Sequence, residues 1–176
     1  MEALLVVDMQ KDFCYKDGSL YVKDAEEIFK ATNAVIKKAR KKMKVVFTQD
    51  WHRSDDEEFK VWPRHCIAGT KGAEIVDELE AQEDDYFIKK RRYSAFFGTD
   101  LDLLFRELKI EKIYICGVVT NICVLHTAGD ASIRGYKVAV IEDCTKALSD
   151  YEQEYAIQHM KKVFNAEILN SKKFCK

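Results

Sequence analysis

Short apolar runs alternate along the chain with segments of helical periodicity, and this alternation constrains the fold more than any other feature. The runs cover residues 3–7, 44–48, 86–89, 113–116, 137–141 and 166–169. Runs of this length are typical of strands that are buried on both faces of a parallel sheet. Between them, residues 24–42, 101–108, 121–133 and 156–164 have the apolar spacing of amphipathic helices.

This pattern predicts an α/β fold, a three-layer sandwich in which a mostly parallel sheet of about six strands carries helices on both faces. The length suits one domain, so we expect residues 1–176 to form a single domain. A short helix is expected over 73–79. Residues 51–71 lack any periodic pattern, and a loop of this length inside a compact domain is usually functional.

Composition excludes several classes of protein. The net charge of −1 and the pI of about 6.4 leave no basic excess, so neither nucleic acid nor a membrane surface is an expected partner. The apolar start at residues 3–7 is too short for a signal peptide or a membrane span. None of the six cysteines forms a C-x-x-C pair, which disfavours a zinc ribbon or a redox dithiol. We therefore expect a cytoplasmic protein with reduced thiols.

Chemically active side chains follow four of the apolar runs. In a parallel sheet the carboxyl ends of the strands share one edge, where ligands bind. The side chains expected at this edge are Asp8, Asp50 with His52, Lys89 and Lys90, and Cys123. Their convergence predicts a functional site there.

Cys123 follows a strand, a glycine break at Gly117 and a polar residue, Thr120. Thr120 is expected to cap a helix, which places Cys123 in the first helical turn. Free amide groups and the helix dipole would lower the thiol pKa there and favour a nucleophilic thiolate. Taken alone, this stretch favours the interpretation of Cys123 as a small buried apolar residue, the common fate of a free cysteine.

Hydrolysis of an amide by a thiol needs a proton carrier, a cation and oxyanion donors as well as the thiolate. Asp8 suits the proton carrier, and the backbone amides of Val119 and Cys123 suit the oxyanion hole. The pattern does not choose between Lys89 and Lys90 for the cation. Each residue also has an ordinary interpretation, since an Asp after a strand often caps a turn and a Lys at a strand end often faces solvent.

Asp50, His52 and His65 together offer one oxygen and two imidazole nitrogens. Such a set suits Zn²⁺ or a similar divalent ion with open positions. His126 and His159 lie in helical segments without a ligand-type partner nearby in sequence, and we interpret both as structural.

Five motifs follow one another along the chain: Val7-Asp8-Met9-Gln10-x-Asp12-Phe13, Thr48-Gln49-Asp50-Trp51-His52, Trp62-Pro63-x-His65-Cys66, Lys90-x-x-Tyr93-Ser94-Ala95-Phe96 and Cys116-Gly117-Val118-Val119-Thr120-Asn121-x-Cys123-Val124. In these motifs the chain resembles the isochorismatase-like cysteine hydrolases and, within them, the nicotinamidases. The resemblance covers nearly the whole chain.

The resemblance implies roles for these residues. Asp8, Lys90 and Cys123 correspond to a catalytic triad, which selects Lys90 over Lys89. Metal ligands implied by the resemblance are Asp50, His52 and His65, for one divalent ion, zinc first and manganese or iron as alternatives. It further implies a cis peptide bond at Val118–Val119, aromatic walls from Phe13 and Trp62, a homo-oligomer, and conversion of nicotinamide to nicotinate in NAD salvage.

One departure from the resemblance leaves the substrate open. After His52 many nicotinamidases carry a Pro-x-Asn-His-x-Ser-Phe run, whereas this chain has an acidic run over residues 53–59. The alternatives are the same chemistry on another small amide or carbamoyl compound, and a non-catalytic ligand-binding member of the family. Isochorismate cleavage and thiol redox chemistry fit less well, because the cysteine and metal residues are present and no second cysteine is paired with Cys123.

Overall fold

Six parallel strands form one sheet in the computed structural model, which covers residues 1–176. The strand order is β3-β2-β1-β4-β5-β6, and every neighbouring pair is parallel. This confirms the predicted sheet. The strands are β1 (Glu2–Val7), β2 (Lys44–Asp50), β3 (Tyr86–Lys90), β4 (Lys112–Val118), β5 (Lys137–Lys146) and β6 (Glu167–Leu169).

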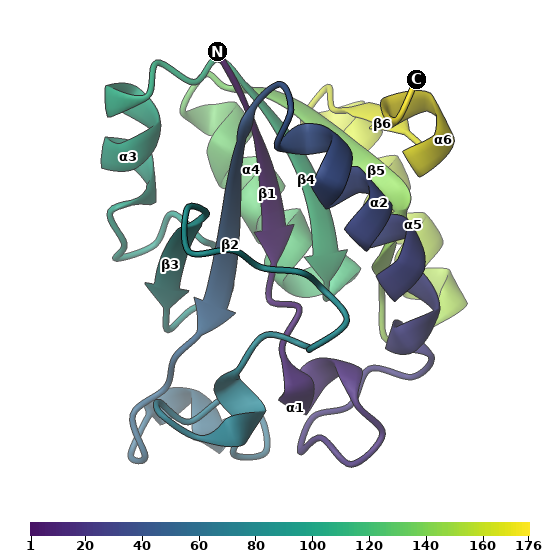
Figure 1. Ribbon diagram of the computed structural model, residues 1–176. Coiled ribbons are helices and arrows are strands. Elements are labelled where there is room, and N and C mark those ends of the chain that lie inside the picture. The colour runs from purple at the N-terminus through teal and green to yellow at the C-terminus, as the bar shows by residue number, and fades with distance from the viewer.

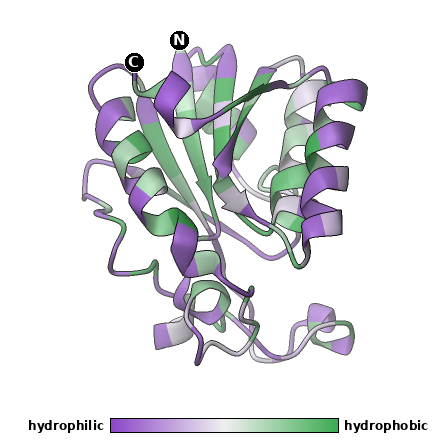
Figure 2. Cartoon of the chain, turned by 90° about the vertical axis from the view of Figure 1, so that its right-hand side faces the viewer, coloured by the Kyte–Doolittle hydropathy of each residue, from purple (hydrophilic) through white to green (hydrophobic).

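Helices cover both faces of this sheet, as Figures 1 and 2 show, so the three-layer prediction is also confirmed. Helices α2 (Phe29–Ala39) and α6 (Ser171–Phe174) lie on one face. Helices α3 (Leu101–Glu107), α4 (Leu125–Ile133) and α5 (Asp150–Val163) lie on the other. The remaining turns are α1 (Lys11–Cys14), the 3₁₀ turns η1 (Ala25–Ile28), η2 (Glu57–Lys60) and η3 (Lys71–Ala73), and the π-helical turn η4 (Thr120–Val124).

The alternation of side chains along β1 explains its unbroken apolar sequence. Leu4 and Val6 pack into the core beneath α2, whereas Leu5 and Val7 pack into the core beneath α3, α4 and α5. All four side chains are fully buried, because a central strand of a covered sheet has no solvent face. In Figure 2 the apolar sheet accordingly lies between two helical layers whose outer sides are hydrophilic.

The expectation of a helix over 73–79 is wrong. Only η3 is helical. Beyond it, Ile75 forms an antiparallel bridge with Gln10, and the chain then turns at Asp77 and Glu78. The Val76 amide donates to the Met9 carbonyl (3.0 Å), and the Lys11 amide donates to the Glu74 carbonyl (2.9 Å). Ala73, Val76 and Leu79, three residues apart, are still buried, so a helical spacing arises without a helix.

The strand order reverses between β1 and β4, with β2 and β3 on one side and β5 and β6 on the other. The carboxyl ends of the strands point to the lower edge in Figure 1, where α1 and the long connection between β2 and β3 lie. The chain therefore positions a site outside the strand ends, at the reversal point, as open parallel sheets do. No helix has both the length and the apolar character needed to cross a membrane.

Candidate active site

Asp8 lies directly after β1, at the reversal point of the sheet. Its backbone φ is +50°, a left-handed conformation that aspartate tolerates better than most residues. The Asp8 amide donates to the Thr48 carbonyl (3.2 Å), and Thr48 Oγ1 donates to Asp8 Oδ1 (2.6 Å). Strand β2 therefore fixes both the backbone and the carboxylate of Asp8, which is fully buried.

Lys90 is the last residue of β3, and its side chain is fully buried. Its Nζ lies 2.7 Å from Asp8 Oδ2 and 3.5 Å from Cys123 Sγ, and it also pairs with Asp50 Oδ1. The neighbouring Lys89 points to the opposite face of the strand, where its Nζ lies 3.9 Å from the centre of the Trp51 ring. The structure thus brings together Asp8, Lys90 and Cys123, and leaves Lys89 outside.

Cys123 lies in η4, which follows β4. Gly117 has a φ of +112°, and a side chain there would clash with the Val7 carbonyl oxygen 2.0 Å away, so only glycine lets β4 approach β1 this closely. The expected cis peptide bond at Val118–Val119 is present. Thr120 is not the helix cap, which corrects the sequence-based expectation. The helical turn already begins after Val119, and Thr120 Oγ1 is buried without a hydrogen-bond partner.

The pKa shift of Cys123 also differs in direction from the expectation. Burial raises the pKa of the Cys123 thiol, and this effect outweighs the attraction of the thiolate to Lys90. Burial likewise raises the pKa of Asp8, although Lys90 opposes the shift. A carboxylate that can accept the thiol proton lies close by, because the ligand-type atoms of Asp8 and Cys123 lie within 4.8 Å of each other.

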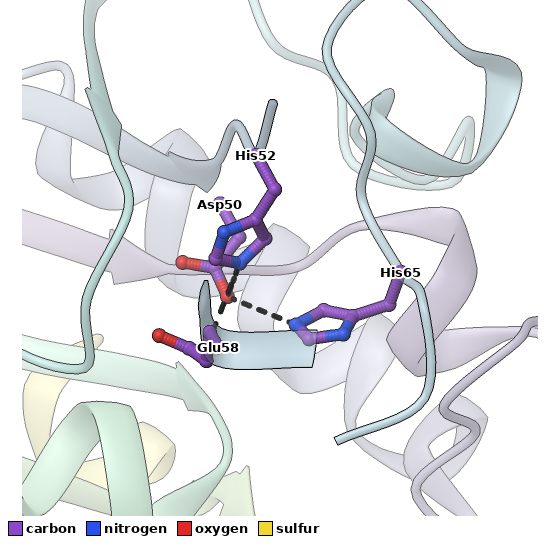
Figure 3. Close-up of side chains that lie close together, drawn as sticks. All are labelled: Asp50, His52, Glu58 and His65. Atoms are coloured by element: carbon purple, nitrogen blue, oxygen red, sulfur yellow. Dashed lines mark ion pairs between the residues drawn. The ribbon is translucent and has the colours of Figure 1, made fainter. Parts of the chain in front are cut away.

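Four side chains from the strand end and the long connection converge beside this triad. Asp50 Oδ2 lies 3.6 Å from His52 Nε2 and 3.7 Å from His65 Nε2, and Glu58 Oε1 lies 3.8 Å from His52 Nε2. Figure 3 shows both imidazole rings turned towards the Asp50 carboxylate, with Glu58 beside them. We call Asp50, His52, Glu58 and His65 the histidine–carboxylate cluster; their donor atoms lie within 4.8 Å of one another.

Contacts behind the two histidines leave one nitrogen of each ring free for a metal. Asp56 Oδ2 lies 3.2 Å from His52 Nδ1, and the Pro63 carbonyl oxygen lies 2.6 Å from His65 Nδ1. The Pro63 acceptor favours a proton on His65 Nδ1 and turns the lone pair of its Nε2 into the cluster. Both ring nitrogens of His52 are buried without a hydrogen-bond partner, so Asp56 favours a proton on His52 Nδ1 through its charge. Two imidazoles and two carboxylates in this arrangement fit a divalent ion such as Zn²⁺.

Glu58 is a member of this cluster that the sequence patterns do not reveal. It lies six positions after His52, in the 3₁₀ turn η2, where no ligand spacing points to it. Asp56, which the patterns also miss, caps this turn by accepting a hydrogen bond from the Glu58 amide (3.1 Å). The one available signal is the acidic run over residues 53–59, which marks a departure from the expected motif but does not indicate which carboxylates turn inward.

A small pocket opens onto both groups of residues. Phe13 and Trp62 form part of its wall, as expected, and Trp62 Nε1 donates to the Tyr93 hydroxyl (2.9 Å). Its lining is Phe13, Leu20, Val22, Asp50, Glu58, Trp62, His65, Tyr93, Val119, Ile122, Cys123 and Leu148, with two carboxylates and neither lysine nor arginine.

The two histidines interpreted as structural lie outside this pocket. His126 is exposed on α4 with its Nδ1 2.7 Å from the Ile122 carbonyl oxygen, and His159 stacks edge-on against Phe164. Neither joins a group of metal-ligand side chains. All six cysteines are free.

Comparisons with known proteins agree with this geometry. A family model described as the isochorismatase domain matches residues 2–172. The nicotinamidase of Saccharomyces cerevisiae is 30% identical over 85% of this chain and 90% of that protein. The solved pyrazinamidase of Pyrococcus horikoshii in complex with zinc is 37% identical, with a TM-score of 0.91 over 96% of this chain and 98% of that chain. The solved N-carbamoylsarcosine amidase of Thermoplasma acidophilum is 34% identical, with a TM-score of 0.88 over 97% of this chain and 96% of that chain.

Proposed function

The chain belongs to the isochorismatase family of hydrolases, and on that premise we propose that it hydrolyses nicotinamide to nicotinate and ammonia. The observation that carries the proposal is the contact of Lys90 Nζ with both Asp8 (2.7 Å) and Cys123 (3.5 Å), beside a small, mainly apolar pocket that Cys123 lines. A thiol, a carboxylate and an ammonium group in mutual contact are suited to hydrolysis of an amide. The nicotinamidase and pyrazinamidase among the relatives support the choice of substrate.

The first half of the proposed reaction forms a thioester. Asp8 takes the proton of the Cys123 thiol, and the sulfur attacks the carboxamide carbon. The backbone amides of Val119 and Cys123 stabilise the oxyanion. The tetrahedral intermediate collapses as Asp8 returns the proton to the departing nitrogen, so that ammonia leaves and the acyl group stays on Cys123. Lys90 keeps this buried exchange close to electroneutral, because it pairs with whichever partner carries the negative charge.

The second half releases the acid. Asp8 removes a proton from water, and the resulting hydroxide attacks the thioester carbonyl. The carbon–sulfur bond breaks, the thiol regains its proton from Asp8, and nicotinate leaves. Phe13 and Trp62 hold the ring during both halves, so that the carboxamide stays against Cys123.

Asp50, His52, Glu58 and His65 are the residues that would hold a divalent metal, which we propose to be zinc, with manganese and iron as alternatives. A bound ion would supply a Lewis-acid contact for the ring nitrogen of the substrate and so orient the ring. The zinc complex of the Pyrococcus horikoshii relative supports the presence of a metal.

A second candidate is hydrolysis of another small amide or carbamoyl compound, which the N-carbamoylsarcosine amidase among the relatives supports. N-carbamoylsarcosine carries a carboxylate. The pocket offers no lysine or arginine to bind that group, whereas it contains two carboxylates. An uncharged aromatic amide is therefore the better match. A non-catalytic member of the family is disfavoured by the complete triad.

Ammonia release by the purified, zinc-loaded protein tests the proposal. The substrates are nicotinamide, pyrazinamide and N-carbamoylsarcosine, each assayed also with Cys123→Ala. We expect turnover of the two aromatic amides, loss of that turnover in the variant, and little or no turnover of N-carbamoylsarcosine. If N-carbamoylsarcosine were hydrolysed faster than the aromatic amides, it would be the better candidate substrate. If none of the three compounds were hydrolysed, the non-catalytic alternative would be favoured.

We propose one domain over residues 1–176, a cytoplasmic homo-oligomer and a role in NAD salvage, which follows from the conversion of nicotinamide to nicotinate. Small amides, rather than nucleic acid or membranes, are the proposed partners. Sedimentation of the purified protein at several concentrations measures the oligomeric state.

A further inference from the structure

Glu58 offers a second carboxylate to the histidine–carboxylate cluster, beyond the three ligands expected from the sequence. Its side chain is 7% exposed, and Oε1 lies 3.8 Å from His52 Nε2 (Figure 3). The other oxygen, Oε2, is buried without a hydrogen-bond partner, and its nearest cation is Arg92 Nη1 at 3.8 Å. A buried carboxylate with so few partners needs a positive charge beside it.

The charges that face the pocket are few and can be assigned. Of the residues that line it, Asp50 and Glu58 are carboxylates, and none is a lysine or arginine. The nearby Asp56 is not part of the pocket lining and is paired with Arg91 (2.8 Å) and Arg92 (2.9 Å). With a divalent ion bound, Asp50 and Glu58 together cancel its charge, whereas Asp50 alone would leave one positive charge facing the ligand.

We propose that Glu58 is a specificity-determining residue, which makes the loaded pocket electrically neutral and so favours uncharged amides over carboxylates. The inference rests on the proposed function, because it assigns a substrate class to the same pocket. It has a consequence for turnover. Hydrolysis converts a neutral amide into an anionic acid, and a neutral pocket holds that acid less firmly than a positive one, so Glu58 also promotes release of the product.

Binding of small probes to the cobalt-loaded protein tests this inference without any substrate. Absorbance of the bound Co²⁺ reports titration with azide, an anion, and with imidazole, a neutral ligand. We compare the unchanged protein with Glu58→Gln, which removes the charge, and Glu58→Asp, which keeps it. Glu57→Gln is the matched control, because Glu57 is the preceding residue of η2 and its side chain is 71% exposed in a surface pair with Lys60.

We expect Glu58→Gln to bind azide about tenfold more tightly relative to imidazole, since one unit charge a few ångströms away changes anion affinity by at least that factor. Glu58→Asp and Glu57→Gln should keep the preference of the unchanged protein. Glu58→Gln should also bind Co²⁺ more weakly, as measured by competition with a coloured chelator. Excess Co²⁺ in the titration keeps Glu58→Gln loaded, so weaker metal binding does not remove the comparison with the unchanged protein.

Two results would overturn the inference. One is an azide preference that is the same in Glu58→Gln and the unchanged protein. The other is an azide preference in Glu58→Asp that is shifted as far as in Glu58→Gln. The length of the side chain, and not its charge, would then be the cause. Because azide and imidazole are not amides, failure here is distinguishable from failure of nicotinamide hydrolysis, which ammonia release measures separately.

Discussion

The triad and the histidine–carboxylate cluster share one edge of the sheet but are held in different ways. Asp8 and Lys90 lie at strand ends, and the pairing of β1, β2 and β3 determines where their backbones lie. His52, Glu58 and His65 instead lie on the connection between β2 and β3, where one isolated β-bridge of His52 with Ile67 and several contacts of polar side chains determine their positions. A parallel sheet thus positions reactive groups by itself, whereas a metal site on a loop depends on a second layer of polar contacts.

Asp50 joins the two regions. Its Oδ1 pairs with Lys90, and its Oδ2 faces the two histidines of the cluster. Loss of Asp50 would therefore damage both regions, so the variants that separate them must lie elsewhere.

The largest expected effect is on the triad side. Cys123→Ala should lower the rate of ammonia release from nicotinamide by about 10⁴-fold or more, because the nucleophile itself is removed. Its zinc content, measured by atomic emission, should stay that of the unchanged protein. Cys175→Ser is the control, since Cys175 is only half-buried and is not part of the pocket lining. Full turnover in Cys123→Ala would refute the thioester mechanism.

On the cluster side, His65→Ala should lower zinc affinity by about 100-fold or more, because it removes one of the four donors. Competition with a chelator measures the affinity. His126→Ala serves as the control, because His126 is exposed on α4 and belongs to no ligand group. Unchanged zinc affinity in His65→Ala would show that the cluster does not hold the metal.

A smaller effect on zinc affinity is expected for a residue that contacts a ligand without binding the metal itself. Asp56→Asn should weaken zinc binding by about 10- to 100-fold, because the carboxylate that orients His52 is lost although every donor remains. Asp55→Asn is a matched control, since Asp55 is the preceding residue and its side chain is 66% exposed in a pair with Arg53. Equal zinc affinity in the two variants would contradict the dependence of the cluster on polar contacts.

A substitution in the pocket wall should have a smaller effect on the kinetics. Tyr93→Phe removes the acceptor of the hydrogen bond from Trp62 Nε1 and should raise KM for nicotinamide about fivefold, which corresponds to a hydrogen bond of about 1 kcal/mol. Because the triad is untouched, kcat should change little. A fall in kcat with unchanged KM would assign Tyr93 to the chemical step instead.

The polar contacts of Asp56 should also make the free energy of unfolding depend on pH in the acid range. Burial raises the pKa of Asp56, but hydrogen bonds from the Glu58 amide and Arg91, together with the adjacent His52, outweigh burial and hold that pKa well below its usual range. A lowered carboxyl pKa stabilises the fold above the unfolded-state value of about 3.9, and this contribution is lost as the pH falls towards the lowered value. Urea unfolding should therefore show a gap between the unchanged protein and Asp56→Asn that is larger at neutral pH than below about pH 4. A gap that grows in acid would contradict the sign.

Much of this organisation can be predicted from the sequence. The apolar runs indicate the strands, and the shared edge of a parallel sheet brings Asp8 and Cys123 together on the strength of the pattern alone. The choice of Lys90 over Lys89 needs the motif resemblance, since the pattern places both at the strand end. Alternation along β3 gives the physical reason, because neighbouring residues face opposite sides.

The rest depends on features without a periodic signal. Glu58 and Asp56 turn inward because of the irregular course of the chain around η2, which no apolar spacing describes. The expectation of a lowered pKa for Cys123 is wrong because helical position alone ignores the burial that the helices on that face impose. The cap expected at Thr120 is wrong because η4 starts one residue earlier than this polar side chain suggests.

The central claim is that Cys123 carries the acyl group during hydrolysis. The most direct test mixes excess zinc-loaded protein with nicotinamide, quenches the reaction in acid within the first turnover, and maps the nicotinoyl group by peptide mass spectrometry. We predict a nicotinoyl thioester on the peptide that contains Cys123, absent in Cys123→Ala. Nicotinate formation in the quenched sample together with an acyl group on another residue, or with continued turnover in Cys123→Ala, would contradict the claim.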